Sequence, residues 1–481
     1  MTTARAAVVI AGALAASAGC SDSLDLAPVV DGPVADTDAD AFPDLDQILL
    51  EAAHSGSGID LVSQTFTNGA ALELSGVPLV DDLVIHMTGR LDASDVAYGR
   101  TCAFSVVDGA APHLFFSRSV KFATLGVAPE TRRLGIGFTY HDGSALLIGG
   151  IDDGNKPVAD IERFDPLTGE FAAVAQVSPR IDAIAAAVGT PGAEDIALIG
   201  GADPTDTMAA GFVEGIDLDA DPPRVDRTDD NIVSRVGMTA TTVADGSVVV
   251  IGGNPPGGGP VAETDQITLV AGSLATKQLR GTLAQPRTGH TATSLGDDEG
   301  ANILVAGGVD ETGAPVATAE LYKPLEDAYS DLHPTMVVPR SQHRAVLLPD
   351  NTVLIVGGVD GSGSAVTTIE RFDEDNGFTD TGAVLPPGSG VIGFTATTLP
   401  DGRILLAGGR ETEGGDPVTA SEIVTLDDLD GTVSVVPTDD LAFPRADQMA
   451  TLMCDGTVWI SGGTAAGMPA ERYNPPAAGR R

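Results

Sequence analysis

The chain has 481 residues, a length that predicts two or three domains or one large repeat array. Its 59 glycines and 31 prolines, against 4% aromatic residues, indicate many short elements joined by tight turns and exclude helical bundles and coiled coils. The 26 basic and 68 acidic residues give a net charge of -42, which would repel nucleic acid and an anionic membrane surface. The hydrophobic content of 43% is still high enough to bury a core, so the chain is not a disordered acidic polymer.

Residues 1–20 are predicted to be an export signal. One positive charge at Arg5 precedes a short apolar run, Ala6 to Ala18, which is too short to span a bilayer. The run ends at Ser17-Ala-Gly-Cys20 and resembles a bacterial lipoprotein signal, although Ser17 stands where leucine is usual. The resemblance implies a lipid on Cys20, as the only membrane attachment, and transport to the outer membrane. The alternative is an ordinary secretory signal and a periplasmic or secreted protein.

Residues 21–55 are expected to form an acidic, flexible linker, because they carry many carboxylates and no hydrophobic periodicity. Within them, Asp36, Asp38, Asp40 and Asp44 resemble the calcium loops of thrombospondin type 3 repeats and EF-hands. Ala41 replaces the glycine of the sharp turn in those loops, and there is only one copy. A solvated linker is therefore favoured over a calcium site.

Residues 56–119 contain several runs typical of strands, such as Asp82-Leu-Val-Ile-His-Met-Thr88 and Cys102-Ala-Phe-Ser-Val-Val107. They lack the glycine punctuation of the residues that follow. We therefore predict a small β-sandwich-like module.

From about residue 120 onward, seven Gly-Gly pairs each end a short run of β-branched or aliphatic residues. The second glycines are separated by 51, 52, 55, 50, 51 and 54 residues. A period near 50 with strand composition predicts a β-propeller, in which each repeat forms one four-stranded blade. The pairs are Gly149-Gly150, Gly200-Gly201, Gly252-Gly253, Gly307-Gly308, Gly357-Gly358, Gly408-Gly409 and Gly462-Gly463.

Other residues keep step with the glycine pairs. An arginine precedes the first strand of each repeat except one, where Gly390 stands: Arg133, Arg180, Arg235, Arg287, Arg340 and Arg445. Asp-Gly turns typical of hairpins follow that strand at Asp142, Asp245, Asp401 and Asp455. An acidic residue opens the third strand: Glu162, Glu214, Asp265, Glu320, Glu370, Glu422 and Glu471.

These registered features resemble the kelch repeat over roughly residues 121–476. The resemblance implies an all-β fold: a seven-bladed β-propeller of the galactose-oxidase and kelch type over residues 120–476. Residues 477–481 would then form a tail. The tryptophan that often ends the third segment of a kelch repeat is missing, since Trp459 is the only tryptophan and lies elsewhere.

The repeated positions are interpreted as structural. The glycine pairs allow unusual backbone angles and close strand packing, and the repeated arginine and acid are expected to pair within or between blades. His290 and His343 share one repeat position, otherwise filled by Met238, Gln448, Ile136, Ala183 and Gly393, so a repeat role is favoured over metal ligation. Acidic residues after the glycine pairs could form a carboxylate rim, but turn formation is favoured: Asp152, Asp203, Asp310, Asp360 and Glu411.

Enzymatic function is compared with binding through the same resemblance. Galactose-oxidase chemistry needs a copper held by two tyrosines and two histidines, one tyrosine being crosslinked to cysteine, and no such grouping stands out among five tyrosines and three cysteines. Sialidase boxes and a nucleophile elbow are also missing, whereas a kelch-fold sugar isomerase stays open. We therefore expect a monomeric, non-catalytic binding or scaffold protein without a cofactor, whose partner is a neutral or cationic protein or glycan.

Two further expectations concern the ends of the propeller. The last repeat contains only three strands, so Val120 to Gly126 should supply the fourth and close the ring. Closure would bring Cys102 near Cys454, and export would place both in an oxidising compartment, which favours a disulfide over two free thiols.

Overall fold

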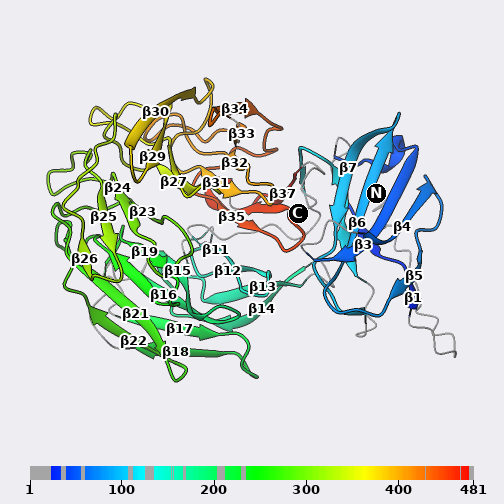
Figure 1. Ribbon diagram of the computed structural model, residues 1–481, viewed down its shortest axis with the longest axis horizontal. Helices are drawn as coiled ribbons and strands as arrows, with labels where there is room; N and C mark the ends of the chain where they lie inside the picture. The colour runs from blue at the N-terminus through cyan, green and yellow to red at the C-terminus, as the bar shows by residue number, and fades with distance from the viewer. Residues whose placement is uncertain are drawn as a thin grey trace.

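The computed structural model describes residues 23–33, 39–55, 60–106, 112–124, 135–152, 154, 156–165, 170–202, 212–228, 235–427, 430–465 and 467–475. These residues form an N-terminal β module beside a ring of β-sheets (Figure 1). Helical structure in this part of the chain is limited to short 3-10 segments such as η1 (Phe42–Asp44) and η4 (Gly463–Ala465). None of its helices is long and apolar enough to cross a membrane.

The ring consists of seven four-stranded antiparallel sheets within the described ranges, each taken here as one blade. In the first six, the strands follow chain order from the innermost to the outermost. Their bounds are β11 Ile136–Thr139, β12 Ala145–Ile148, β13 Asp160–Asp165 and β14 Glu170–Gln176; β15 Ile181–Thr190, β16 Ala193–Ala202, β17 Val213–Asp217 and β18 Arg224–Thr228; β19 Thr239–Thr242, β20 Val248–Ile251, β21 Thr264–Val270 and β22 Ser273–Gln278; β23 Thr291–Ser294, β24 Ile303–Ala306, β25 Glu320–Lys323 and β26 Ala328–Tyr329; β27 Arg344–Leu347, β28 Val353–Val356, β29 Thr368–Asp373 and β30 Gly377–Val384; β31 Thr395–Thr398, β32 Ile404–Ala407, β33 Ser421–Leu426 and β34 Val433–Pro437.

The innermost strands contact one another in sequence around the ring, and β35 (Met449–Leu452) contacts β11, which completes it. The second strands form the core: all four residues of β12, β20, β24, β28, β32 and β36 (Val458–Ser461) are buried. All fourteen glycines of the Gly-Gly pairs have positive φ, between 58° and 97°. A Cβ on Gly308 would lie 2.6 Å from the carbonyl oxygen of Thr288 in the same blade, so these positions need glycine for both backbone angle and space.

The predicted closure of the ring is confirmed. β10 (Lys121–Thr124) pairs antiparallel with β37 (Glu471–Asn474) and forms the outermost strand of the last blade. Phe122 lies opposite Tyr473, with ring centroids 5.0 Å apart, and both side chains are buried. The last blade therefore takes three strands from the C-terminus and one from the segment after the N-terminal module.

The N-terminal module begins earlier than predicted. It has a five-stranded sheet, one face of which packs against two two-stranded sheets. Its strands are β1 Ser23–Leu26, β2 Val29–Asp31, β3 Gln47–His54, β4 Asp60–Thr67, β5 Leu74–Pro78, β6 Leu83–Leu91, β7 Ser94–Arg100, β8 His113–Phe115 and β9 Ser117–Arg118. The predicted linker over 21–55 is thus wrong for residues 23–33 and 39–55. β3 lies inside the sheet, between β4 and β6, and buries Ile48 and Leu50.

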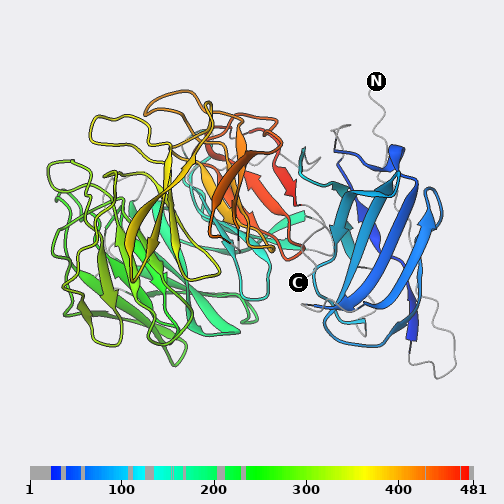
Figure 2. The same cartoon turned by 45° about the horizontal axis from the view of Figure 1, so that its top comes forward.

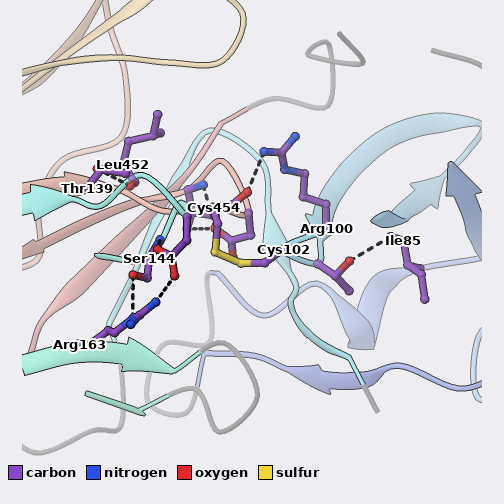
Figure 3. The surroundings of a disulfide bond; sticks show 12 residues. Ile85, Arg100, Cys102, Thr139, Ser144, Arg163, Leu452 and Cys454 are labelled. Atoms are coloured by element: carbon purple, nitrogen blue, oxygen red, sulfur yellow. Dashed lines mark hydrogen bonds and ion pairs between the residues drawn. A yellow bond between two sulfur atoms is a disulfide. The ribbon is translucent and has the colours of Figure 1, made fainter. Parts of the chain in front are cut away.

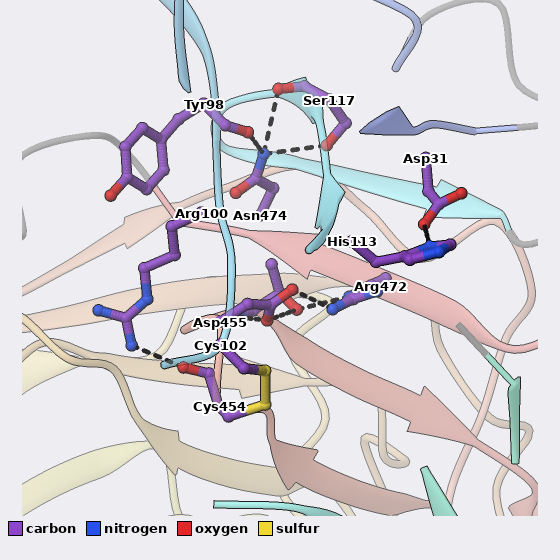
Figure 4. A network of polar contacts seen from close by, with 11 residues as sticks. Asp31, Tyr98, Arg100, Cys102, His113, Ser117, Cys454, Asp455, Arg472 and Asn474 are labelled. Atoms are coloured by element: carbon purple, nitrogen blue, oxygen red, sulfur yellow. Dashed lines mark hydrogen bonds and ion pairs between the residues drawn. A yellow bond between two sulfur atoms is a disulfide. The ribbon is translucent and has the colours of Figure 1, made fainter. Parts of the chain in front are cut away.

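The module lies beside the last blade (Figure 2) and is fixed to it by polar and covalent contacts (Figure 3). The structure joins Cys102 to Cys454 by a disulfide with a Cα–Cα distance of 5.0 Å. Arg100 donates to the carbonyl oxygen of Cys454 at 2.8 Å. The Asn474 side-chain amide donates to the carbonyl oxygens of Tyr98 and Ser117 at 2.6 and 3.1 Å (Figure 4). The two parts of the chain therefore share a buried, hydrogen-bonded junction.

Candidate functional site

The repeated arginine and acid form buried ion pairs inside single blades. Five pairs join the arginine before the innermost strand to the acid that opens the third strand or lies near its start: Arg180–Glu214 (2.5 Å), Arg235–Asp265 (2.5 Å), Arg287–Glu320 (2.8 Å), Arg340–Glu370 (2.6 Å) and Arg445–Glu471 (3.1 Å). The arginine Nη1 of four of these also donates to the carbonyl oxygen of the first glycine of its own blade's pair, as Arg287 does to Gly307 at 3.3 Å. These charges hold each blade together and do not face a ligand. Arg133 lies outside the described residues.

The sixth blade departs from this pattern, and the predicted register there is wrong by one residue. Val391, rather than Gly390, occupies the arginine position, because its carbonyl oxygen accepts the N–H of Gly358 just as that of Arg340 accepts the N–H of Gly308. The acid of this blade, Glu422, instead accepts a hydrogen bond from the Ser389 hydroxyl. A neutral hydroxyl therefore replaces the buried guanidinium.

His290 and His343 are buried between neighbouring blades. Nε2 of His290 lies 3.1 Å from the Thr239 hydroxyl, and Nε2 of His343 lies 3.0 Å from the Thr291 hydroxyl. Burial, aided by nearby arginines, lowers the pKa of each to about 3, so both are neutral at pH 7. In the next blade Phe394 fills this position against Gly357, and not Gly393 as expected. The histidines therefore act as packing residues of the repeat.

The described residues do not fit the copper site that the galactose-oxidase resemblance would require. Tyr329 donates to or accepts from Thr264, and Tyr473 packs on Phe122. Cys102 and Cys454 are bonded to each other, so neither is available for a tyrosine crosslink in this structure. No group of three His, Cys, Asp or Glu side chains in the described ranges is arranged to hold a metal ion.

The acidic residues after the glycine pairs form turns, as favoured from the sequence. The Asp310 carboxylate accepts from the backbone N–H groups of Thr312 and Ala314, and Asp360 does the same for Ser362 and Ser364. Asp152 accepts from two backbone N–H groups of its own loop. These contacts leave no carboxylate rim at these three loops; Asp203 lies outside the described residues.

Of the predicted calcium ligands, Asp40 accepts the N–H of Phe42 at 3.1 Å and Asp44 pairs with Arg118. Asp36 and Asp38, as well as the predicted lipidation site Cys20, lie outside the described residues. The calcium and lipid predictions therefore stay predictions.

A different group of side chains gathers where the innermost strands begin. Two residues after the arginine position, six blades have a residue with positive φ. Three are glycines, Gly237, Gly289 and Gly393, and three are not: Asp182 (φ 55°), Gln342 (φ 59°) and Asp447 (φ 55°). A left-handed backbone costs a residue with a Cβ roughly 1–2 kcal/mol, and such strain tends to be retained at functional sites.

We call Asp182, Gln342, Arg344, Arg410 and Asp447 the axial cluster. Arg410 Nη1 and Asp447 Oδ2 lie 2.7 Å apart. Asp182 of the second blade and Asp447 of the seventh interact electrostatically. Burial, and then the negative charge of Asp447, raise the pKa of Asp182. Arg344 donates through Nε to the carbonyl oxygen of Phe394 at 3.0 Å. Asp182, Gln342, Arg344 and Asp447 are all exposed, so their polar ends face solvent at one end of the ring.

The axial cluster can form hydrogen bonds and ion pairs with a polar molecule, and contains two guanidiniums, two carboxylates and one amide. The cluster was not predicted from the sequence because its five residues come from four different blades and form no contiguous motif. One signal could have indicated it. Asp182, Gln342 and Asp447 stand at a repeat position that holds glycine in other blades, and the glycine of the sixth blade, Gly393, aligns with them only when Val391 is placed at the arginine position.

The architecture defines the class of this chain: it is a β-propeller. The family description "Kelch motif" matches residues 132–177, which span the first repeat. Among solved structures, a "Novel fungal alcohol oxidase with catalytic diversity among the AA5 family, in complex with copper" is 16% identical, covers 73% of this chain and 77% of its own, and has a TM-score of 0.55. "Structure of YjhT" is 14% identical, covers 60% and 93%, and has a TM-score of 0.44. At 16% identity, the likeness to the alcohol oxidase concerns the fold alone. No curated protein matches the sequence.

Proposed function

We propose that the chain is an exported, non-catalytic binding or scaffold protein, and that its propeller binds a polar partner at the axial cluster. One observation carries this proposal. The charged residues of the repeats are used within the blades, whereas Asp182, Gln342, Arg344 and Asp447 are exposed together and three of them occupy strained backbone. The cluster offers hydrogen-bonding groups of both charges.

The partner is expected to be a neutral or cationic protein or glycan. The net charge of -42 penalises polyanions through the long-range field of the whole protein. Binding of a basic partner should weaken as salt rises, because exposed charges are screened over about 10 Å at 0.1 M. Attachment to the outer membrane through a lipid on Cys20 is part of the proposal, and a Cys20→Ala variant should then be recovered without lipid.

The test is a glycan array and an envelope pull-down with the mature protein and three variants. Arg344→Ala and Asp447→Asn should each weaken binding of the captured ligand at least tenfold. Arg90→Ala is the matched control, since Arg90 forms an exposed pair with Asp95 on the N-terminal module. Equal binding by all variants would place the binding site elsewhere. Turnover of a sugar by the wild type that is lost in an axial variant would replace the binding proposal with a sugar-modifying enzyme.

A further inference from the structure

The boundary between the third and fourth blades differs from its neighbours at the end of the ring opposite the axial cluster. At four other boundaries a side chain of one blade reaches the turn between the third and fourth strands of the next. These contacts are His141–Asp219, Arg224–Gly272, Asn302–Glu374 and Arg371–Gly431.

In the fourth blade the corresponding turn contacts the third blade through Asp327. The Asp327 carboxylate accepts the backbone N–H groups of Arg280 and Gly281, each at 3.1 Å, just beyond the end of the outermost strand β22. Inside this contact lies a crevice with a volume of about 150 Å³. Residues of both the third and the fourth blade line this crevice.

The crevice has apolar walls and a charged rim. Val249, Leu279 and the ring of Tyr322 form its buried part. Leu325 stands at its edge with 71% of its surface exposed, the highest value among the exposed large apolar residues of the described chain. An apolar side chain of a partner would find contacts both with Leu325 and with the buried wall of the crevice.

The charges at the rim select the kind of partner. Asp245 and Glu299 line the crevice together with a single lysine, Lys277. Both acids and the lysine are exposed, so carboxylates outnumber ammonium groups where a ligand would enter. An apolar side chain flanked by basic residues would bury its body against Leu279 and place its charges near these carboxylates.

We infer that the crevice between the third and fourth blades is a docking site for a partner protein segment in which an apolar side chain is flanked by lysine or arginine. This surface is separate from the axial cluster, so loss of either one leaves the other testable. The geometry of the rim excludes an acidic segment as the occupant, because Asp245 and Glu299 would repel it.

The experiment uses three labelled peptides at 0.15 M salt: Gly-Lys-Leu-Lys-Gly, Gly-Lys-Ser-Lys-Gly and Gly-Glu-Leu-Glu-Gly. Fluorescence anisotropy with the mature protein should show the Lys-Leu-Lys peptide binding at least fivefold more tightly than either of the others. Equal binding of the Lys-Ser-Lys peptide would mean unspecific attraction to an acidic protein and would overturn the proposal.

Two variants locate the site. Leu325→Ser and Glu299→Gln should each weaken binding of the Lys-Leu-Lys peptide at least threefold, and both residues are exposed, so the fold is expected to tolerate them. Val436→Ser is the matched control, because Val436 is 56% exposed on the outer strand of the sixth blade. An equal loss in the control, or no loss in the two crevice variants, would contradict the assignment. The axial variant Arg344→Ala should bind this peptide like the wild type, which separates this test from that of the axial cluster.

Discussion

Arg340 and Glu370 lie 2.6 Å apart in the fifth blade, and neither side chain exposes more than 1% of its surface. Removing one partner of such a pair leaves an uncompensated buried charge. We expect Arg340→Met to lower the free energy of unfolding by about 3–5 kcal/mol. Chemical denaturation would measure the loss.

The control for this prediction is an exposed pair. Arg224 and Asp226 are 45% and 50% exposed, and Asp226→Asn should change the free energy of unfolding by less than about 1 kcal/mol. Similar losses for the buried and the exposed pair would show that the repeated pairs are not what stabilises the blades.

The two buried histidines should make the protein sensitive to acid. Their pKa is about 3 in the folded protein and about 6.5 when unfolded, so the unfolded state binds more protons between these values. The stability they contribute is complete above pH 6.5 and is lost as pH falls towards 3. His343→Phe copies Phe394 of the next blade and should reduce the loss between pH 7 and pH 4 by about 3 kcal/mol. An unchanged pH profile of thermal unfolding in this variant would contradict the assignment.

The propeller could be predicted from the sequence because its determinants are local and repeated. Gly-Gly pairs, Asp-Gly turns and the Arg and Glu positions each serve one blade, so seven copies reinforced one interpretation. The sixth blade shows the limit: Gly390 was aligned with the arginines, although the hydrogen bond to Gly358 comes from Val391. The spacing held the missed signal: Val391 precedes Gly408 by 17 residues, just as Arg340 precedes Gly357 and Arg445 precedes Gly462.

The remaining errors arise from contacts between distant segments. Residues 47–54 contain the run Ile-Leu-Leu but lie within an acidic stretch, so they were predicted to belong to a linker. The structure shows that they form a strand paired with both β4 and β6. The axial cluster is likewise assembled from four blades, and the crevice is lined by residues of two blades. No local pattern encodes these arrangements.

Closure of the ring by β10 predicts a loss of cooperativity when that strand is removed. Deleting residues 118–128 would expose the edge of β37 and the buried faces of Tyr473 and Trp459. We expect the variant to lose its single cooperative unfolding transition in calorimetry. A truncated protein that melts like the parent would show that the three C-terminal strands close the ring without it.

The strained backbone of the axial cluster predicts opposite effects on stability and binding. Gln342 has φ 59° at a position where Gly289 serves the preceding blade, so Gln342→Gly removes strain of roughly 1–2 kcal/mol. It also adds freedom to the unfolded chain, at a cost of about 0.4–1 kcal/mol. A net gain of about 0.5–1 kcal/mol in unfolding free energy, with weaker ligand binding, is the expected outcome. Lower stability would indicate that the amide has a structural role instead.

The disulfide predicts that neither Cys102 nor Cys454 contributes a free thiol to the mature protein. Titration of the denatured, unreduced protein should detect neither Cys102 nor Cys454, and two titratable thiols would contradict the bond.

The bond closes a chain segment with a sequence separation of 352 residues that includes almost the whole propeller, so its loss frees the unfolded chain substantially. Cys102→Ser together with Cys454→Ser should lower the free energy of unfolding by about 4 kcal/mol. Arg100 and Asn474 still connect the module to the last blade in this variant, so the folded module should stay docked. Limited proteolysis between residues 100 and 121 would test this: protection equal to the wild type is expected, and rapid cleavage would mean that the disulfide alone holds the junction.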